Sequence, residues 1–190
     1  MKAFKEQLFQ LFEVNELQAE HILSLFKREE LAKGDLFLAV GKSADRLSFI
    51  ASGYCRVVKW TEEKEVTQWI GSSGYFMTDL SSFFFNQPAL GTIEALSPMV
   101  IWTLSKTDYQ SLEKQFPEWN LLEKRFLAKC FMQIESRVFD FIGLSAEERY
   151  LKYFHQHKAL FNQVPLQYIA SVLGMSPETL SRIRNKLAIS

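Results

Sequence analysis

Histidine and cysteine are scarce in this chain, and their scarcity excludes several classes of site. The 190 residues include two cysteines and three histidines, and no histidine lies between His21 and His155. An iron–sulfur cluster held by four thiolates is therefore excluded, and a haem site with axial histidines is disfavoured. His155 and His157 are two residues apart on a predicted helix, so their side chains diverge. We expect no metal site and no cofactor.

Long apolar runs are also missing. No uninterrupted stretch reaches the roughly 18 residues that a membrane-spanning helix needs, so we expect no membrane partner. The first residues, MKAFKEQLFQLF, are interrupted by charge and do not resemble a signal peptide. These features predict a cytoplasmic protein, in which Cys55 and Cys130 are separate thiols rather than a disulfide.

The chain as a whole has no excess of charge of either sign, but its parts do. Basic and acidic residues number 22 each, so nothing attracts the whole chain to nucleic acid. From Ser145 onward, however, six basic and three acidic residues give +3 and leave −3 for the rest. A basic module on an acidic body is typical of a nucleic-acid-binding domain joined to a second domain.

The pattern of residue types changes twice along the chain. The first 33 residues have apolar positions at helical spacing and are expected to be helical. Several segments rich in β-branched and aromatic residues follow, separated by turn residues: GDLFLAVG, RLSFIASGYCRVVKW, KEVTQWIG and TIEALSPMVIWTL. They predict an antiparallel β region of the size of a small double-sheet jelly roll.

A long helix is predicted from Pro117 to Gly143, because no breaker interrupts EWNLLEKRFLAKCFMQIESRVFDFIG. Two apolar stripes run along it. The first has heptad spacing and consists of Leu127, Phe131, Ile134, Val138 and Phe141. The second consists of Trp119, Leu122, Phe126 and Cys130. One stripe could cover the β region and the other an identical helix of a second copy, although a single buried core helix would also carry two stripes.

Segment 164–187, VPLQYIASVLGMSPETLSRIRNKL, predicts two short helices joined by a tight turn. Pro165 suits the first position of a helix, where its missing N–H is not needed. Gly174 suits the left-handed residue that ends the first helix, and Ser176 suits the N-cap of the second. The apolar positions that would be buried are Leu166, Ile169, Ala170, Leu173, Leu180, Ile183 and Leu187. An ordinary helical hairpin with a solvated polar face would show the same pattern.

The run Ser176-Pro177-Glu178-Thr179-Leu180-Ser181-Arg182 resembles the recognition helix of the catabolite-activator and fumarate–nitrate-regulator (Crp/Fnr) superfamily, typically Ser-x-Glu-Thr-Val-x-Arg. The resemblance implies that Glu178 and Arg182 contact base edges, since Arg can donate two bonds to guanine and Glu can accept one from cytosine. Pro177 stands where the family often has Arg, so one contact is expected to be missing. The residues expected to bind DNA are Glu178, Thr179, Ser181, Arg182, Asn185, Lys186 and Gln167, with Arg184 a further candidate for backbone contact.

Residues 49–70, FIASGYCRVVKWTEEKEVTQWI, resemble the hairpin of cyclic-nucleotide-binding barrels, with Gly53 at the turn. Such barrels carry Gly-Glu-Leu and, further on, Arg-Ser-Ala, in which the Arg pairs with the cyclic phosphate. The matching positions here are Thr78-Asp79-Leu80 and Ala89-Leu90-Gly91, and no Arg lies between Arg56 and Arg125.

We therefore expect a degenerate effector pocket that includes Asp79, Leu80, Ala89 and Leu90 and does not respond to cyclic AMP or GMP. Asp79 could still hold a hydroxyl group. Any pocket would be lined by Phe83, Phe84, Phe85, Trp69 and Leu90, although these aromatic residues could equally form core.

The expected fold class is α+β, with three parts. Residues 1–116 form an N-terminal jelly-roll (cyclic-nucleotide-binding-like) barrel with N-terminal helices, 117–143 a dimerisation helix and 144–190 a helix-turn-helix domain. The chain ends at Ser190, so a winged-helix-like module without the wing is expected. Gly143 and the capping pattern of Ser145 and Glu148 predict a hinge.

The expected function is that of a homodimeric, sequence-specific transcription regulator of Crp/Fnr type. Its expected partners are palindromic double-stranded DNA and a second copy of the chain, with RNA polymerase and an unknown small-molecule effector as further candidates from the resemblance. The alternative is a ligand-binding or protein-interaction module that has lost DNA reading. An enzyme is disfavoured because the barrel region lacks histidine and an activated nucleophile.

Overall fold

Two antiparallel four-stranded sheets form the centre of the N-terminal half, in a computed structural model that describes residues 4–6, 8–9 and 14–188. The first sheet has the order β1-β8-β3-β6, with bounds Lys27–Leu31, Met99–Ser105, Arg46–Ser52 and Phe76–Met77. The second has the order β2-β7-β4-β5, with bounds Leu36–Leu38, Thr92–Ala95, Cys55–Trp60 and Glu65–Gly71. This is the double-sheet architecture predicted by the short β-branched and aromatic segments and the turn residues between them.

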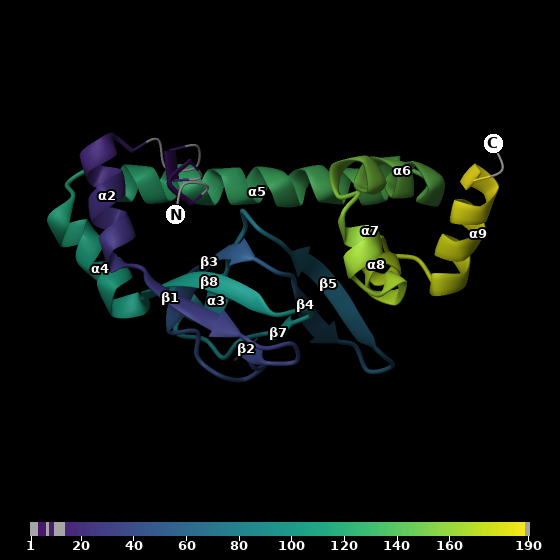
Figure 1. Cartoon of the computed structure of the whole chain (residues 1–190), viewed down its shortest axis with the longest axis horizontal. Helices are drawn as coiled ribbons and strands as arrows, with labels where there is room; N and C mark the ends of the chain where they lie inside the picture. Colours follow the sequence, from purple (N-terminus) through teal and green to yellow (C-terminus); the bar gives the residue numbers. More distant parts are fainter. Residues whose placement is uncertain (1–3, 7, 10–13, 189–190) are drawn as a thin grey trace.

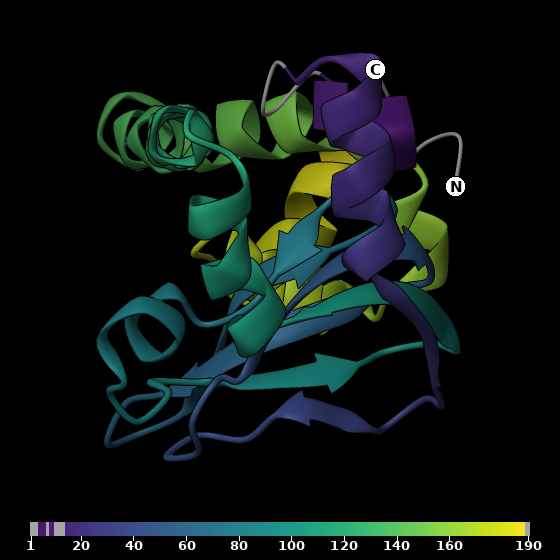
Figure 2. The ribbon, with the colours of Figure 1, turned by 90° about the vertical axis from the view of Figure 1, so that its left-hand side faces the viewer.

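Helices cover both ends of the β region and one of its sides (Figure 1). Near the N-terminus and around the domain formed by the two sheets, which is called the barrel below, lie α2 (Glu16–Leu25), α3 (Leu80–Phe85) and α4 (Lys106–Gln115). The long α5 (Trp119–Gly143) runs beside the barrel, as the end-on view also shows (Figure 2). At the far end of α5 lie α6 (Ala146–Gln156), α7 (Leu160–Gln163), α8 (Leu166–Val172) and α9 (Pro177–Ala188).

The barrel core lies between the two sheets. Its central side chains are at most 2% exposed: Phe49, Ile50, Ile93, Ile101 and Leu104. The β3–β4 hairpin turns at Gly53, as the sequence predicts, with φ +90°. A Cβ on Gly53 would lie 2.4 Å from the carbonyl oxygen of Pro98, so only glycine fits both the conformation and the space.

One prediction about the N-terminal part is wrong. Helical spacing predicted helix through the first 33 residues, but α2 ends at Leu25 and residues 27–31 form β1. β1 pairs with β8 in register Lys27↔Thr103 to Leu31↔Met99. The segment KREEL is charged because β1 is an edge strand, which needs only one pairing partner and tolerates charged side chains. Main-chain pairing with β8 thus overrides the local helical pattern.

After α5 the chain reverses direction. α5 ends at Gly143, and Ser145 caps α6 in a capping box with Glu148, as predicted. The two helices are linked by the ion pair between Lys152 and Asp140, whose Nζ and Oδ1 atoms are 2.6 Å apart. In the described part of the chain, no helix combines the length and apolarity needed to cross a membrane.

Candidate functional site

The α8–α9 pair has the tight turn that its sequence predicts. Gly174 adopts φ +65°, the left-handed conformation that ends the first helix. The main-chain N–H of Thr179 donates to Oγ of Ser176 over 3.2 Å, which caps α9. Leu180 is 1% exposed and Ile183 is 7% exposed, so the inner face of α9 is fixed in the C-terminal core. α8 begins one residue later than predicted, with Pro165 as its N-cap.

The outer face of α9 presents polar side chains to solvent. Glu178, Ser181, Arg182 and Asn185 are exposed and border a shallow open hollow together with Pro177. Arg182 stands four residues after Glu178, so both lie on one side of the helix. This face can offer a guanidinium fork and a carboxylate to the same partner.

The other residues expected at this surface differ in their exposure and in their contacts. Thr179 is half-buried and its hydroxyl lies 3.2 Å from that of Ser176. Gln167 is exposed on α8. Lys186 is exposed on α9, but its Nζ lies 2.7 Å from a carboxylate oxygen of Glu147 on α6. An exposed pair of this kind is worth little, up to about 1 kcal/mol, so Lys186 can exchange it for another anion.

The charge state of Glu178 is set by the start of its own helix. Hydrogen bonds from its own main-chain N–H and from Ser176 hold the pKa of Glu178 below its ordinary value. The carboxylate is therefore ionised throughout the neutral range and can only accept hydrogen bonds.

An apolar stripe on α5 faces solvent. Phe131, Ile134, Val138 and Phe141 are 67%, 55%, 51% and 41% exposed, whereas Leu127 is half-buried and packs against the barrel core. The second stripe faces the barrel, with Trp119, Leu122 and Phe126 at 3–5% exposed. Three further exposed side chains, which the heptad pattern did not predict, widen the solvent-facing stripe, namely Met132, Phe139 and Ile142. Each of them directly follows a residue of the heptad stripe, so heptad spacing alone omits them.

The four residues of the expected degenerate pocket lie in one segment, in which main-chain N–H groups engage the carboxylate of Asp79. Asp79 caps α3 by accepting from the N–H of Ser82 over 2.9 Å, and its other carboxylate oxygen accepts from the N–H of Leu90 over 3.0 Å. Ala89 is 2% exposed, whereas the side chains of Leu80 and Leu90 are 37% and 60% exposed. The carboxylate of Asp79 thus occupies the main-chain N–H groups of Ser82 and Leu90.

The aromatic residues expected to line that pocket do not share one cavity. Phe83 is 2% exposed and belongs to the barrel core, where its ring lies 5.1 Å from that of Tyr109. Phe85 is 73% exposed at the end of α3. Trp69 lies on β5, where its ring is 6.0 Å from that of Tyr75 and faces the C-terminal helices. The alternative of ordinary core therefore holds for Phe83.

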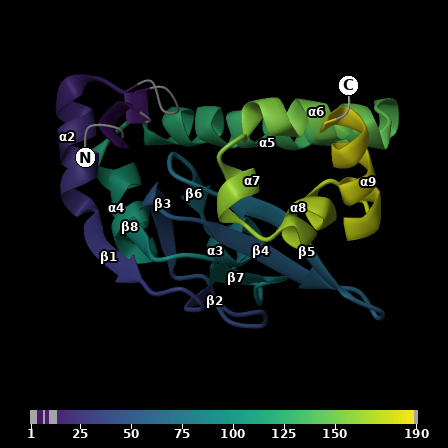
Figure 3. The same cartoon turned by 45° about the vertical axis from the view of Figure 1, so that its right-hand side comes forward.

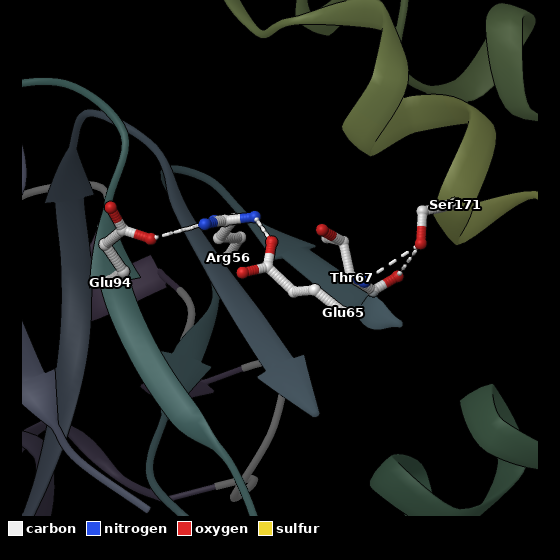
Figure 4. Close-up of polar contacts among 5 residues, drawn as sticks. All are labelled: Arg56, Glu65, Thr67, Glu94 and Ser171. Atoms are coloured by element: carbon white, nitrogen blue, oxygen red, sulfur yellow. Dashed lines mark hydrogen bonds and ion pairs between the residues drawn. The ribbon is translucent and has the colours of Figure 1, made fainter. Parts of the chain in front are cut away.

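The barrel and the C-terminal helices contact each other through β5 and α8. β5 is one of the two edge strands of its sheet, and the N–H of Thr67 donates to Oγ of Ser171 on α8 over 2.9 Å (Figure 4). Ile70 of β5 is buried in the C-terminal core rather than in the barrel. The side chain of Ser171 thus gives the exposed edge of the sheet a partner, and Figure 3 shows α8 in front of β4 and β5.

Arg56 on β4 reinforces this contact. Its side chain is 8% exposed and lies between Glu65 and Glu94, with Nη1–Oε1 and Nη2–Oε2 distances of 2.5 and 2.8 Å (Figure 4). Its guanidinium carbon lies 4.0 Å from the ring centre of Tyr168 on α8. A guanidinium stacked on an aromatic face gains a cation–π interaction, so Arg56 joins the barrel to the first helix of the α8–α9 pair.

Both cysteines are free thiols, as predicted. Burial raises the pKa of Cys55 to about 12 and also raises that of Cys130. Neither thiol is an activated nucleophile, since reactive cysteines have lowered pKa values.

Comparison with known proteins supports the architecture. Residues 28–116 match the family model of the cyclic nucleotide-binding domain. No curated protein matches the chain. Among solved structures, a Ruegeria pomeroyi protein named as a candidate cyclic nucleotide binding protein is 20% identical with a TM-score of 0.71, covering 99% of this chain and 88% of its own.

Two further structures share the fold over nearly the whole chain. The catabolite activator protein of Thermus thermophilus is 21% identical with a TM-score of 0.60, and the alignment covers 96% of this chain and 86% of that one. CLP of Xanthomonas campestris, described as a c-di-GMP responsive global regulator, is 15% identical with a TM-score of 0.67, and 92% of each chain is covered. At these identities the likeness concerns the fold: a cyclic-nucleotide-binding type of β domain, a long helix and a C-terminal helical region.

Proposed function

We propose that this protein is a homodimeric transcription regulator of Crp/Fnr type that reads DNA with α9. The observation that carries the proposal is the exposed face of α9, where Glu178 and Arg182 project from a helix whose inner side is locked in a core. In helix-turn-helix proteins the N-terminal part of the second helix contacts base edges in the major groove. Both residues lie in that part of α9.

The other exposed residues of the α8–α9 pair divide into two roles. Ser181 and Asn185 stand beside Arg182 and are proposed to contact bases or phosphates at the same groove. Gln167, Lys186 and Thr179 are proposed to contact the sugar–phosphate backbone, which positions the helix without reading sequence.

A second copy of the chain is the proposed occupant of the solvent-facing stripe on α5. Contiguous exposed apolar surface of this kind is typical of an interaction site, and a stripe with heptad spacing fits an identical helix. A two-fold dimer would present two copies of α9, and such dimers bind half-sites about one helical turn apart. The fold shared with a catabolite activator protein and with CLP supports this arrangement.

The barrel is proposed not to bind cyclic AMP through the loop of residues 79–91. Ala89 and Leu90 provide no cation for a phosphate, and Asp79 already accepts from the main chain of that loop. A different small molecule is the proposed effector, and RNA polymerase remains a proposed partner once the protein is bound to DNA.

Selection of bound sequences from a random double-stranded DNA pool, at near-physiological salt, tests this function. We expect wild-type protein to enrich a palindrome, and Arg182→Ala to lose that enrichment. The matched control is Arg28→Ala, which removes an exposed arginine from β1 and should enrich the same palindrome as wild type.

Failure of wild type to enrich any sequence would favour the alternative function, in which the chain is a ligand-binding or protein-interaction module. Equal enrichment by wild type and Arg182→Ala would place sequence reading outside α9.

A further inference from the structure

A large cavity lies between the barrel and the C-terminal helices, away from the loop of residues 79–91. Its volume is about 680 Å³, within the range of small-molecule sites. Its walls come from β5, from the C-terminal half of α5, from α6 and from the end of α8. The aromatic part of the wall consists of Trp69, Tyr75, Phe141 and Tyr153. A ligand here would contact both halves of the molecule at once.

Two arginines in the wall hold positive charge that no acidic side chain neutralises. Arg137 donates to the main-chain carbonyls of Gln68 and Val172, over 2.5 and 2.9 Å. Arg149 donates to the carbonyls of Leu173 and Leu144, over 3.2 and 2.8 Å. In the part of the chain that the structure describes, neither guanidinium forms an ion pair with a carboxylate.

Both cations are also stacked on aromatic rings and only partly exposed to solvent. The guanidinium carbons of Arg137 and Arg149 lie 5.6 and 5.1 Å from the ring centre of Phe141, and Arg137 lies 5.3 Å from that of Trp69. Burial lowers the pKa of Arg137, because removing a charged guanidinium from water is unfavourable. The one acidic residue in the cavity wall, Asp140, is paired with Lys152 at 2.6 Å.

We propose that this cavity binds a small aromatic anion, with the aromatic walls stacking on its ring and Arg137 receiving its negative group. A guanidinium carries five N–H donors, and the two carbonyls of Gln68 and Val172 leave Arg137 donors for an anion. The anion would replace the solvation that burial has removed from Arg137. The ring system would stack on Trp69 or Tyr153, as aromatic side chains favour.

The site lies apart from the exposed face of α9 and meets the solvent-facing stripe of α5 only at its edge, where Met132 and Phe141 belong to both. Other wall residues of α5, such as Gln133, Ser136 and Arg137, lie on the side of the helix away from Val138 and Phe131. α9 contributes no wall residue. Because the ligand contacts β5 and α8 together, its binding stabilises the contact in which Thr67 bonds Ser171, and so fixes α8–α9 against the barrel.

Titration with two fluorescent probes tests the proposal without requiring DNA. The first is 8-anilinonaphthalene-1-sulfonate, an aromatic sulfonate, and the second is its uncharged analogue N-phenyl-1-naphthylamine. We expect saturable binding of the sulfonate at one site per chain and at least about tenfold weaker binding of the uncharged probe, since a charge-assisted bond is lost.

Three variants locate the bound probe. Arg137→Gln should weaken sulfonate binding about tenfold or more. Ser136→Trp should block binding by filling the cavity, while it leaves the hydrogen bonds of Arg137 in place. Arg28→Gln, which removes a distant exposed arginine, should bind as wild type does. Circular dichroism establishes that each variant is folded.

The proposal is overturned if the folded Ser136→Trp variant binds the sulfonate as wild type does, or if both probes bind equally well. It is also overturned if Val138→Arg weakens sulfonate binding and the cavity variants do not. The probe would then lie on the exposed stripe of α5. No saturable binding to wild type would likewise contradict it.

Discussion

Two surfaces of this molecule lie where a regulator of the proposed type would bind DNA and a small-molecule effector, and their acidic side chains are used in opposite ways. On α9, Glu178 and Arg182 project outward while Leu180 and Ile183 hold the helix from behind. In the loop of residues 79–91, the carboxylate of Asp79 turns inward and binds the main chain of its own loop. The first surface is open to a partner, and the second is satisfied by itself.

Under the proposed function, the difference explains how a site can be lost without loss of fold. A recognition helix needs only its inner face to fold, so its outer residues are free for function. A phosphate-binding loop has main-chain donors that must be satisfied whether or not ligand is present. A carboxylate within the loop can satisfy them permanently, and the barrel then keeps its shape without the anion.

The largest expected effect comes from separating the two copies of α9. Val138→Arg places a like charge from each copy on the apolar stripe of α5, so the dimer should dissociate. A monomer binds only one half-site at a time. Operator affinity should therefore fall about 10²-fold or more, because the second copy of α9 is no longer held close to its half-site. Sedimentation and DNA titration measure both effects. Gln133→Arg, on another side of α5, should remain dimeric, and a dimeric Val138→Arg protein would refute the interface.

The next effect concerns the turn that aims α9. Gly174→Ala puts a side chain at φ +65°, which costs about 1–2 kcal/mol, and its Cβ would lie 2.5 Å from a ring carbon of Phe141. Gly34→Ala is the matched control, since Gly34 has φ +91° with no atom within 4 Å of an added Cβ. Urea unfolding should show a larger loss for Gly174→Ala. Equal losses would mean that Phe141 does not restrict the turn.

A smaller effect is expected in residues 79–91, where Asp79 accepts hydrogen bonds from the main chain. Asp79→Ala removes the N-cap of α3 and the acceptor for Leu90, and loss of such a cap costs about 0.5–2 kcal/mol. The free energy of unfolding should fall by that amount, while the DNA sequence selected by the protein stays unchanged. A changed sequence preference in this variant would break the distinction between the two surfaces.

The smallest effect is a pH dependence at the contact between the two halves. Burial lowers the pKa of His157, at the end of α6, below its ordinary value of 6.5. The unfolded chain therefore binds the proton more readily, and stability falls as pH drops from about 6.5 through the lowered pKa. His157→Gln should flatten that part of the stability curve. An unchanged slope between pH 7 and 5 would show that His157 does not contribute.

Local signals in the sequence were sufficient for the elements that carry caps and breakers. Ser176 and Gly174 identified the α8–α9 turn, and Gly143 with Ser145 identified the break after α5. The double-sheet architecture also followed from short strands with turn residues between them. In each case the physical constraint acts within a few residues, so a pattern can record it.

Long-range contacts could not be predicted in this way. β1 exists because β8 pairs with it, although its own residues are charged and continue a helical pattern. The bond between Thr67 and Ser171 spans 104 residues, and nothing near either residue indicates it. Arg137 looks like a solvated position on α5, but the fold brings it against β5 and α8. The cavity between the halves depends on these contacts and was missed for that reason.

The most direct measurement of the central claim is the affinity of the wild-type protein for its selected palindrome, compared with the same palindrome carrying about five extra base pairs between the half-sites. Such an insertion rotates one half-site by about half a helical turn. If two copies of α9 are held in one rigid dimer, affinity should fall to that of a single half-site. Equal affinity for the two DNAs would contradict a dimeric reader built on α5 and α9.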